Sequence, residues 1–198
     1  MNDINDIFSL ADKQPEPQRG SLIIAKPTVD DDCFARSVIV TINHSSNGSM
    51  GLIINRPTGI TLNDVIPGLV TDEQIPLFLG GPVDCDMLFY LHTLGDIIHD
   101  SRPVMPGLYI GGEHDSMKRY INNGGQVFGK MKFILGYSGW AAGQLATEID
   151  RHDWAIVMPD NTEMIMREGG DDIWRESVAN LGERYRMWLN WPIDLSMN

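Results

Sequence analysis

Residues 133–149, which read FILGYSGWAAGQLATEI, hold the side chain best placed to act as a nucleophile, that of Ser138. An apolar run stops at a glycine-rich turn around this serine, and apolar residues then recur at helical spacing. A strand, a sharp turn and a helix form the setting in which hydrolases expose a serine for acyl transfer. That motif requires a glycine two residues after the serine, where this chain has Trp140. The match to a nucleophile motif is therefore incomplete.

A serine nucleophile also needs a base within hydrogen-bond reach. His152 follows in the expected chain order, but at the far end of the helix that Ser138 would begin. About 14 residues of helix span roughly 20 Å, so His152 is too distant to serve Ser138. His92 and His99 remain open as alternatives, with no pattern that favours either. We predict that Ser138 caps the following helix, because serine is a preferred N-cap residue.

Several glycine turns could instead receive an anion. Gly80-Gly81 precedes a proline, and Gly111-Gly112 leads into a predicted helix, whose free amides can hold phosphate. Glu113 would repel that phosphate, and no lysine stands where a phosphate-binding loop needs one. Gly143 falls inside the helix predicted after Ser138, where glycine costs about 1 kcal/mol relative to alanine. Either close packing against its backbone or a ligand bound there would explain why glycine occupies this position.

The remaining chemistry-bearing residues form no recognisable metal or redox pattern. The five histidines lack paired ligand spacing, and Cys33 and Cys85 are too few and too far apart for a zinc site or a disulfide framework. The acidic triplet at 30–32 is predicted to be a solvated loop. We expect no metal and no cofactor.

Arg56 follows a short apolar run and precedes Pro57, which holds its backbone extended. A guanidinium there can bind a carboxylate or phosphate ligand, or pair with one of the many acids of the chain. The ion pair is the interpretation that we favour.

Composition limits the partners. Twenty-seven acids against fifteen Lys and Arg give a formal charge of −12, and the basic residues are dispersed. Direct nucleic-acid binding is disfavoured, because phosphate backbones reward clustered cations. No apolar run approaches the roughly 20 residues of a membrane span, and residues 1–20 lack the features of a secretory signal. The sequence favours a cytoplasmic protein without a membrane segment.

These residues must be positioned by an α+β domain. Seven or eight short strands are predicted, mostly in the first two-thirds of the chain, with helices concentrated late. Residues 1–19 are predicted to be an N-terminal extension and linker, because Pro15 and Pro17 end any helix there. Residues 20–198 then form one domain.

Together the motifs resemble the AlgH-like (YqgE-type) family of small bacterial proteins. The resemblance runs from about Arg19 to the C-terminus. In one clear departure, the acid that usually follows Gln-Leu is replaced by Ala146, so that only Glu148 is kept. The matching segments are residues 20–27 (GSLIIAKP), 34–38 (FARSV), 51–57 (GLIINRP), 80–83 (GGPV), 91–92 (LH), 111–112 (GG), 136–140 (GYSGW) and 143–145 (GQL).

The resemblance implies one α+β domain with a strongly bent, barrel-like mixed sheet and flanking helices. It also implies a regulatory role, often described as transcriptional, and no catalytic set carries over. In this family's pattern the position of Ser138 tolerates alanine, which weakens the hydrolase hypothesis further.

We therefore expect a non-enzymatic cytoplasmic regulator that acts through protein partners. The alternative is a small-molecule or nucleotide-binding enzyme of the hydrolase type that uses the glycine turns. A ligand- or partner-binding surface is expected where five side chains could converge, namely Arg56, His92, Ser138, Trp140 and Gln144.

Overall fold

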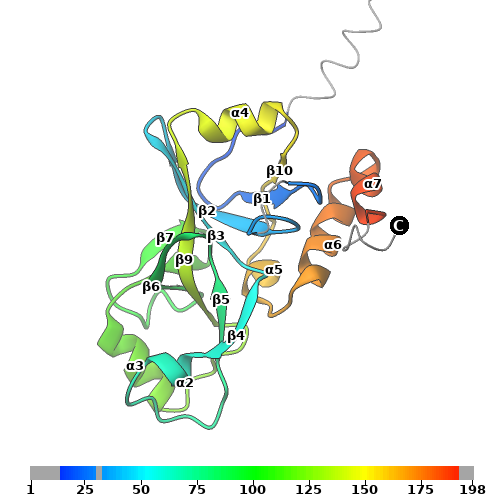
Figure 1. Cartoon of the computed structure of the whole chain (residues 1–198). Coiled ribbons are helices and arrows are strands. Elements are labelled where there is room, and N and C mark those ends of the chain that lie inside the picture. Colours follow the sequence, from blue (N-terminus) through cyan, green and yellow to red (C-terminus); the bar gives the residue numbers. More distant parts are fainter. Residues whose placement is uncertain (1–13, 30–32, 192–198) are drawn as a thin grey trace, which may run out of the picture.

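The computed structural model describes residues 14–29 and 33–191 of the chain, and a ten-stranded sheet is its frame (Figure 1). The strands are β1 (Leu22–Ala25), β2 (Val38–Ser45), β3 (Gly48–Ile53), β4 (Pro57–Thr61), β5 (Pro76–Leu79), β6 (Val83–His92), β7 (Arg102–Met105), β8 (Leu108–Ile110), β9 (Met131–Ala141) and β10 (Trp154–Val157). The helices are α2 (Leu62–Val65), α3 (His114–Asn122), α4 (Gln144–Asp150), α5 (Glu163–Met166), α6 (Asp171–Asn180), the 3₁₀ helix η1 (Glu183–Tyr185) and α7 (Arg186–Leu189).

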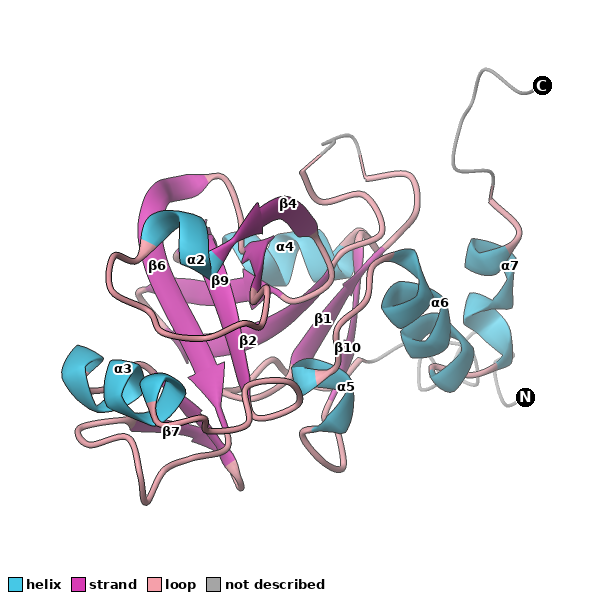
Figure 2. Ribbon diagram, turned by 90° about the horizontal axis from the view of Figure 1, so that it is seen from below, coloured by secondary structure: helices cyan, strands magenta, loops and turns pink. Residues whose placement is uncertain are grey.

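The strand order along the main path is β10-β1-β2-β3-β9-β6-β8-β7, so the sheet does not close on itself. Strand β5 pairs with β9 in parallel and with β4 in antiparallel orientation, which makes the sheet mixed. Helices α6 and α7 lie at one end of the molecule, and α2 and α3 lie at the other (Figures 1 and 2). The predicted single α+β domain is confirmed. The described residues contain ten strands, more than the seven or eight predicted.

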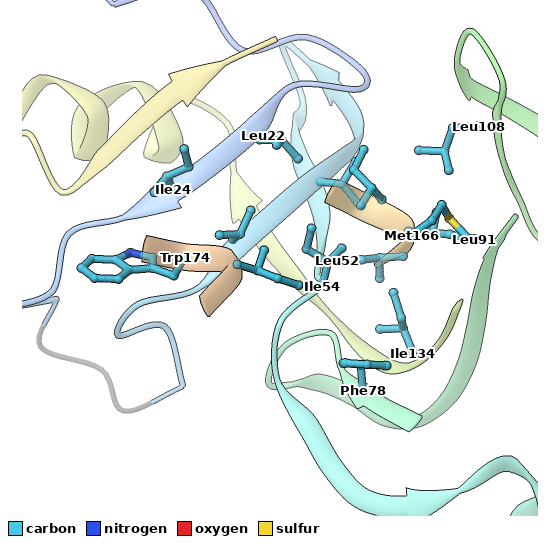
Figure 3. Packing of buried hydrophobic residues seen from close by; sticks show 14 of the residues in the cluster. Leu22, Ile24, Leu52, Ile54, Phe78, Leu91, Leu108, Ile134, Met166 and Trp174 are labelled. Atoms are coloured by element: carbon cyan, nitrogen blue, oxygen red, sulfur yellow. The ribbon is translucent and has the colours of Figure 1, made fainter. Parts of the chain in front are cut away.

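Both faces of the sheet are buried near β1, and this explains the continuous apolar run of that strand. Successive side chains of a strand point to opposite faces. Leu22 and Ile24 accordingly pack in the core cluster that contains Trp174 of α6, whereas Ile23 and Ala25 pack in the cluster that contains Leu145 of α4. Figure 3 shows the first of these clusters, where Met166 of α5 also packs. A strand covered by helices on both faces has no polar side to display.

Strand β9 runs through the glycine turn that the sequence predicts. It continues from Met131 to Ala141 without a break at Ser138, so the predicted N-cap role of Ser138 is wrong. Residues 138–141 pair with β3, and Ser138 lies opposite Gly51. This cross-strand pairing outweighs the local turn propensity of the glycines, because each pairing satisfies backbone groups that a turn would leave to water.

Helix α4 accordingly begins later than predicted, at Gln144, with Gly143 as its N-cap. Leu145 and Ile149 do pack in the cluster beneath α4, whereas Ala141 is an exposed strand residue. Gly143 has a φ of +74°, and a Cβ built on it meets nothing within 4 Å. The glycine is explained by its left-handed backbone and not by a close neighbour.

A side chain covers part of the open edge of β10. The Gln14 carboxamide donates from Nε2 to the Trp154 carbonyl at 2.8 Å and accepts from the Ile156 amide at 2.8 Å. These two backbone groups face away from β1. The amide of Gln14 thus fills the place of a peptide group on a further strand.

Two predictions made from the sequence concern residues that the structure does not describe. The acidic triplet at 30–32 and most of the proposed extension at 1–19 lie outside the described residues. The boundary between extension and domain stays a prediction.

Candidate functional site

Two of the five predicted site residues meet at a carboxylate. Trp140 Nε1 donates to Glu148 Oε2 at 2.9 Å, and Gln144 Nε2 donates to Glu148 Oε1 at 2.9 Å. Trp154 of β10 donates its own Nε1 proton to Glu148 Oε2 at 2.7 Å. One half-buried carboxylate therefore ties β9, α4 and β10 together. Glu148 is the acid that the chain keeps near the replaced position Ala146.

The ring of Phe34 completes this cluster. Its centroid lies 6.4 Å from that of Trp140 and 5.7 Å from that of Trp154. Trp140 and Trp154 are 6% and 3% exposed, so their indole groups are closed to a ligand. The cluster fastens α4 to the sheet and satisfies its own donors, which is a structural role.

Ser138 and Arg56 make backbone contacts elsewhere. Ser138 is fully buried, and its Oγ donates to the Gly80 carbonyl at 2.9 Å. A hydroxyl that donates to a carbonyl is not activated by a base, so this geometry lacks the feature that a nucleophile needs. Arg56 is half-buried, and its Nη2 donates to the Ala35 carbonyl at 3.0 Å.

His92 is the last residue of β6, and it pairs with Met131 at the first residue of β9. Trp140 lies near the other end of β9. His92 Nδ1 accepts from the Leu94 amide at 3.2 Å, so the proton is assigned to Nε2, 2.9 Å from the Gly111 carbonyl. Burial lowers the pKa of this imidazole, which keeps it neutral. Residues 131 and 140 are about 30 Å apart along an extended strand, so His92 does not join Trp140 and Gln144.

The glycines around Gly81 serve packing. A Cβ built on Gly81 would lie 2.3 Å from the carbonyl carbon of Tyr137, which is in β9. No side chain fits between two backbones at that distance. This explains the glycine without a ligand.

One cavity is lined by residues of α5, of α6 and of the end of β10. Figure 2 shows where these three elements lie in the fold. We call this cavity the α5–α6 groove; its volume is about 480 Å³. It is lined by the apolar residues Leu22, Val157, Met158, Pro159, Met164 and Leu181, by the acids Asp160, Glu163 and Glu176, and by Asn161, Arg167, Ser177 and Asn180. None of these residues belongs to a sequence motif that predicts a site.

The groove combines an apolar lining with an acidic rim. Met158 is 43% exposed although it is a large apolar side chain, and Met164 packs against the core beside it. Asp160, Glu163 and Glu176 are exposed. Methionine side chains adapt to irregular apolar partners, and carboxylates attract cations. The groove therefore suits an apolar segment that carries positive charge.

Arg167 is held rigidly at one wall of the groove. Its Nη2 donates to Glu176 Oε2 at 2.7 Å, and its carbonyl accepts from Lys132 Nζ at 2.6 Å. Arg167 Nε is buried, and no described residue accepts its proton. A buried donor without an acceptor is uncommon in folded proteins.

Lys132 supports that wall from within the sheet. It is 2% exposed, its Nζ also donates to the Ile54 carbonyl at 2.8 Å, and it lies 4.5 Å from the Phe78 ring centroid. Burial lowers the pKa of Lys132 to about 7, and the negative charge of Glu168 opposes this shift. The sequence carries one signal of this role, because Lys132 lies between the apolar residues Met131 and Phe133.

Two general features of the described residues bear on the kind of site. None of their helices has the length and apolarity to cross a membrane. Nor do residues 14–29 and 33–191 contain a group of three or more His, Cys, Asp and Glu side chains arranged to hold a metal ion.

Comparison with known proteins gives consistent matches over nearly the whole chain. A family model described as AlgH-like matches residues 22–186. A UPF0301 protein of Bacteroides fragilis is 42% identical over 198 residues, which is 100% of both chains. A UPF0301 protein of Bacteroides thetaiotaomicron is 41% identical over 192 residues, 97% of each chain.

Two solved structures share the fold. The solution structure of the AlgH protein from Pseudomonas aeruginosa has a TM-score of 0.69 at 27% identity and covers 91% of this chain and 98% of its own. A crystal structure of a Corynebacterium diphtheriae protein has a TM-score of 0.74 at 22% identity and covers 90% of this chain and 95% of its own.

Proposed function

The chain belongs to the AlgH-like family, and from that premise we propose that it is a non-enzymatic cytoplasmic regulator that binds a protein partner in the α5–α6 groove. The observation that carries the proposal is the apolar, methionine-containing lining of this groove with the exposed carboxylates of Asp160 and Glu163 at its rim. The third rim carboxylate, that of Glu176, is paired with Arg167. The partner contributes a segment in which apolar residues are flanked by Lys or Arg.

Charge favours a protein partner over nucleic acid. The net charge of −12 repels phosphate backbones at long range, and it attracts a basic protein segment. Any effect on transcription then runs through the bound protein. The same charge speeds association, because complementary fields steer the encounter.

The hydrolase alternative gains no specific support from the geometry. Ser138 is enclosed and donates to Gly80, and the glycine at Gly81 is accounted for by its contact with Tyr137. Partner binding is therefore the function that we propose.

The test is selection of peptides from a random display library, followed by affinity measurement by fluorescence anisotropy. We expect enriched peptides to combine apolar residues with Lys or Arg. The double charge reversal Asp160→Lys with Glu163→Lys should weaken their binding at least ten-fold, because it removes two rim carboxylates and adds two repelling cations. Added salt should weaken binding to the unmodified protein.

A matched control is Glu73→Lys, a charge reversal at an exposed acid outside the groove. Its affinity should stay close to that of the unmodified protein. Enrichment of acidic peptides, or equal affinities for the double variant and the unmodified protein, would contradict the proposal.

A further inference from the structure

The helix α7 and the two residues after it present large apolar side chains to solvent. These residues, 186–191, read RMWLNW, and we call them the α7 arm. Met187 is 69% exposed and Trp191 is 44% exposed. The backbone continues to turn up to Trp191, whose amide donates to the Trp188 carbonyl at 3.2 Å, so Met187 and Trp191 lie on the same side of the arm. An exposed apolar patch of this kind marks an interaction surface.

The α7 arm is anchored by its inner side chains and by its backbone. Trp188 and Leu189 pack against the core cluster that contains Trp174. Arg36 donates from Nη2 to the Trp191 carbonyl, and Arg36 is itself paired with Asp171 at 2.8 Å. Side chains on an anchored backbone lose less conformational entropy when they bind. The outer side chains of the arm are therefore preorganised for a contact.

The composition of the arm matches what the α5–α6 groove suits. The groove has apolar residues on its walls, among them the exposed Met158, and the carboxylates of Asp160 and Glu163 at its rim. The arm combines Met187 and Trp191 with one cation and no acid. Tryptophan is the residue most enriched at the energetic centres of protein interfaces. The arm of one molecule is thus an apolar, cationic segment of the type that the groove of another would bind.

Arg186 supplies the positive charge of the arm. Its Nη2 lies 2.8 Å from Glu183 Oε1, and both side chains are mostly exposed. An exposed ion pair contributes little to stability, because water solvates both charges. Arg186 can therefore exchange Glu183 for a carboxylate at the rim of the groove at little cost.

The arm and the groove lie at the same end of the molecule. Helix α7 packs against α6, whose residues Glu176, Ser177 and Asn180 line the groove (Figure 1). Two complementary surfaces on one molecule can pair twice about a twofold axis, with each arm in the groove of the other copy. Such a closed arrangement doubles the contact and leaves neither surface open for further growth.

From these observations we propose that the α7 arm of one molecule binds the α5–α6 groove of a second copy of this chain, in a reciprocal dimer. The proposal rests on the proposed function, because it assigns an occupant to the same groove. A protein partner must then displace the arm, so self-association inhibits partner binding. The net charge of −12 on each copy opposes their approach, which makes the dimer weak and dependent on concentration.

Sedimentation equilibrium of the full chain, over a hundred-fold range of concentration at physiological salt, tests the proposal. We expect a reversible monomer–dimer equilibrium. Met187→Asp and Trp191→Ala should each weaken it at least five-fold. The groove variant Asp160→Lys with Glu163→Lys should weaken it as much, although this variant lowers the net negative charge and with it the long-range repulsion between copies.

Met87→Asp is the matched control, because Met87 is a 48% exposed methionine of β6 that belongs neither to the arm nor to the groove. It adds the same charge as Met187→Asp and should leave the dimer unchanged. A chain that stays monomeric at every concentration, or a dimer that the arm and groove variants leave intact, would overturn the proposal.

A peptide selected for the groove separates this proposal from the proposed function. Such a peptide should dissociate the dimer, and at high protein concentration it should bind Met187→Asp more tightly than the unmodified protein. If a peptide binds the groove and the dimer persists, self-association through the arm is refuted and the proposed function stands. If no peptide binds the groove while the arm and groove variants still weaken the dimer, the proposed function fails and the self-association stands.

Discussion

Glu148 shows at the scale of one residue how a polar group can stabilise a mostly apolar region. Its carboxylate accepts hydrogen bonds from Trp140, Gln144 and Trp154, whose positions it thereby links. Two of these donors are on buried indoles. Removal of a buried acceptor leaves its donors unsatisfied, at a cost of about 1–3 kcal/mol.

We therefore predict that Glu148→Gln lowers the free energy of unfolding by about 1–2 kcal/mol. An amide has one acceptor oxygen in place of two, so its NH₂ group must face one of the three donors. Chemical denaturation followed by tryptophan fluorescence measures the loss. Glu73→Gln, at an exposed acid, should change stability by less than about 0.5 kcal/mol; equal effects of the two substitutions would refute this account of Glu148.

At the scale of elements, the region from β9 to α4 shows why boundaries escape sequence reasoning. The apolar spacing of Leu145 and Ile149 correctly predicted which face of α4 is buried. The strand end was misplaced because Ser138 and Trp140 pair with β3, more than 85 residues earlier in the chain. Local turn propensity cannot anticipate such a partner.

Gly143, the N-cap of α4, gives a prediction for the beginning of a helix. Gly143→Ala should destabilise the protein by about 1–2 kcal/mol, because alanine must adopt a φ near +74°. Nothing lies within 4 Å of the added Cβ, so the cost is conformational and not steric. Asparagine tolerates this conformation better, so Gly143→Asn should lose less stability in thermal or chemical denaturation. A greater loss for asparagine than for alanine would contradict the conformational explanation.

For the whole molecule, the fold class was accessible from the sequence and the candidate sites were not. Short apolar runs and late helices sufficed for an α+β domain. The α5–α6 groove brings Leu22, near the start of the domain, together with Glu176, near its end. Contacts between residues so distant in the sequence depend on how β1, β10 and α6 pack. No local sequence pattern encodes this packing. The motif around Ser138 identified relatives rather than a reaction.

The free energy of unfolding should depend on pH because of Lys132. Its pKa in the unfolded chain is the ordinary 10.5, and in the folded protein it is about 7. Between these values the unfolded chain binds more protons, so the free energy of unfolding rises with pH by up to about 1.4 kcal/mol per unit. This contribution is complete above about pH 10.5 and is lost as the pH falls to about 7.

Urea denaturation from pH 6 to 10 of the unmodified protein and of Lys132→Met isolates this effect. The unfolding free energy of the unmodified protein minus that of Lys132→Met should rise as the pH increases above 7. Below pH 7 this difference should stay constant. Lost hydrogen bonds to Ile54 and Arg167 shift the variant by an amount independent of pH. Parallel profiles across this range would show that Lys132 does not titrate as proposed.

The carboxamide of Gln14 on strand β10 has a consequence for how copies of the molecule meet. An uncovered strand edge is a template on which another chain can extend the sheet, and such growth leads to aggregation. Gln14 occupies the Trp154 carbonyl and the Ile156 amide without itself being part of a strand. We therefore expect this side chain to hinder edge-to-edge association, so that substitution of Gln14 should first promote aggregation in concentrated solution, before any loss of folding stability.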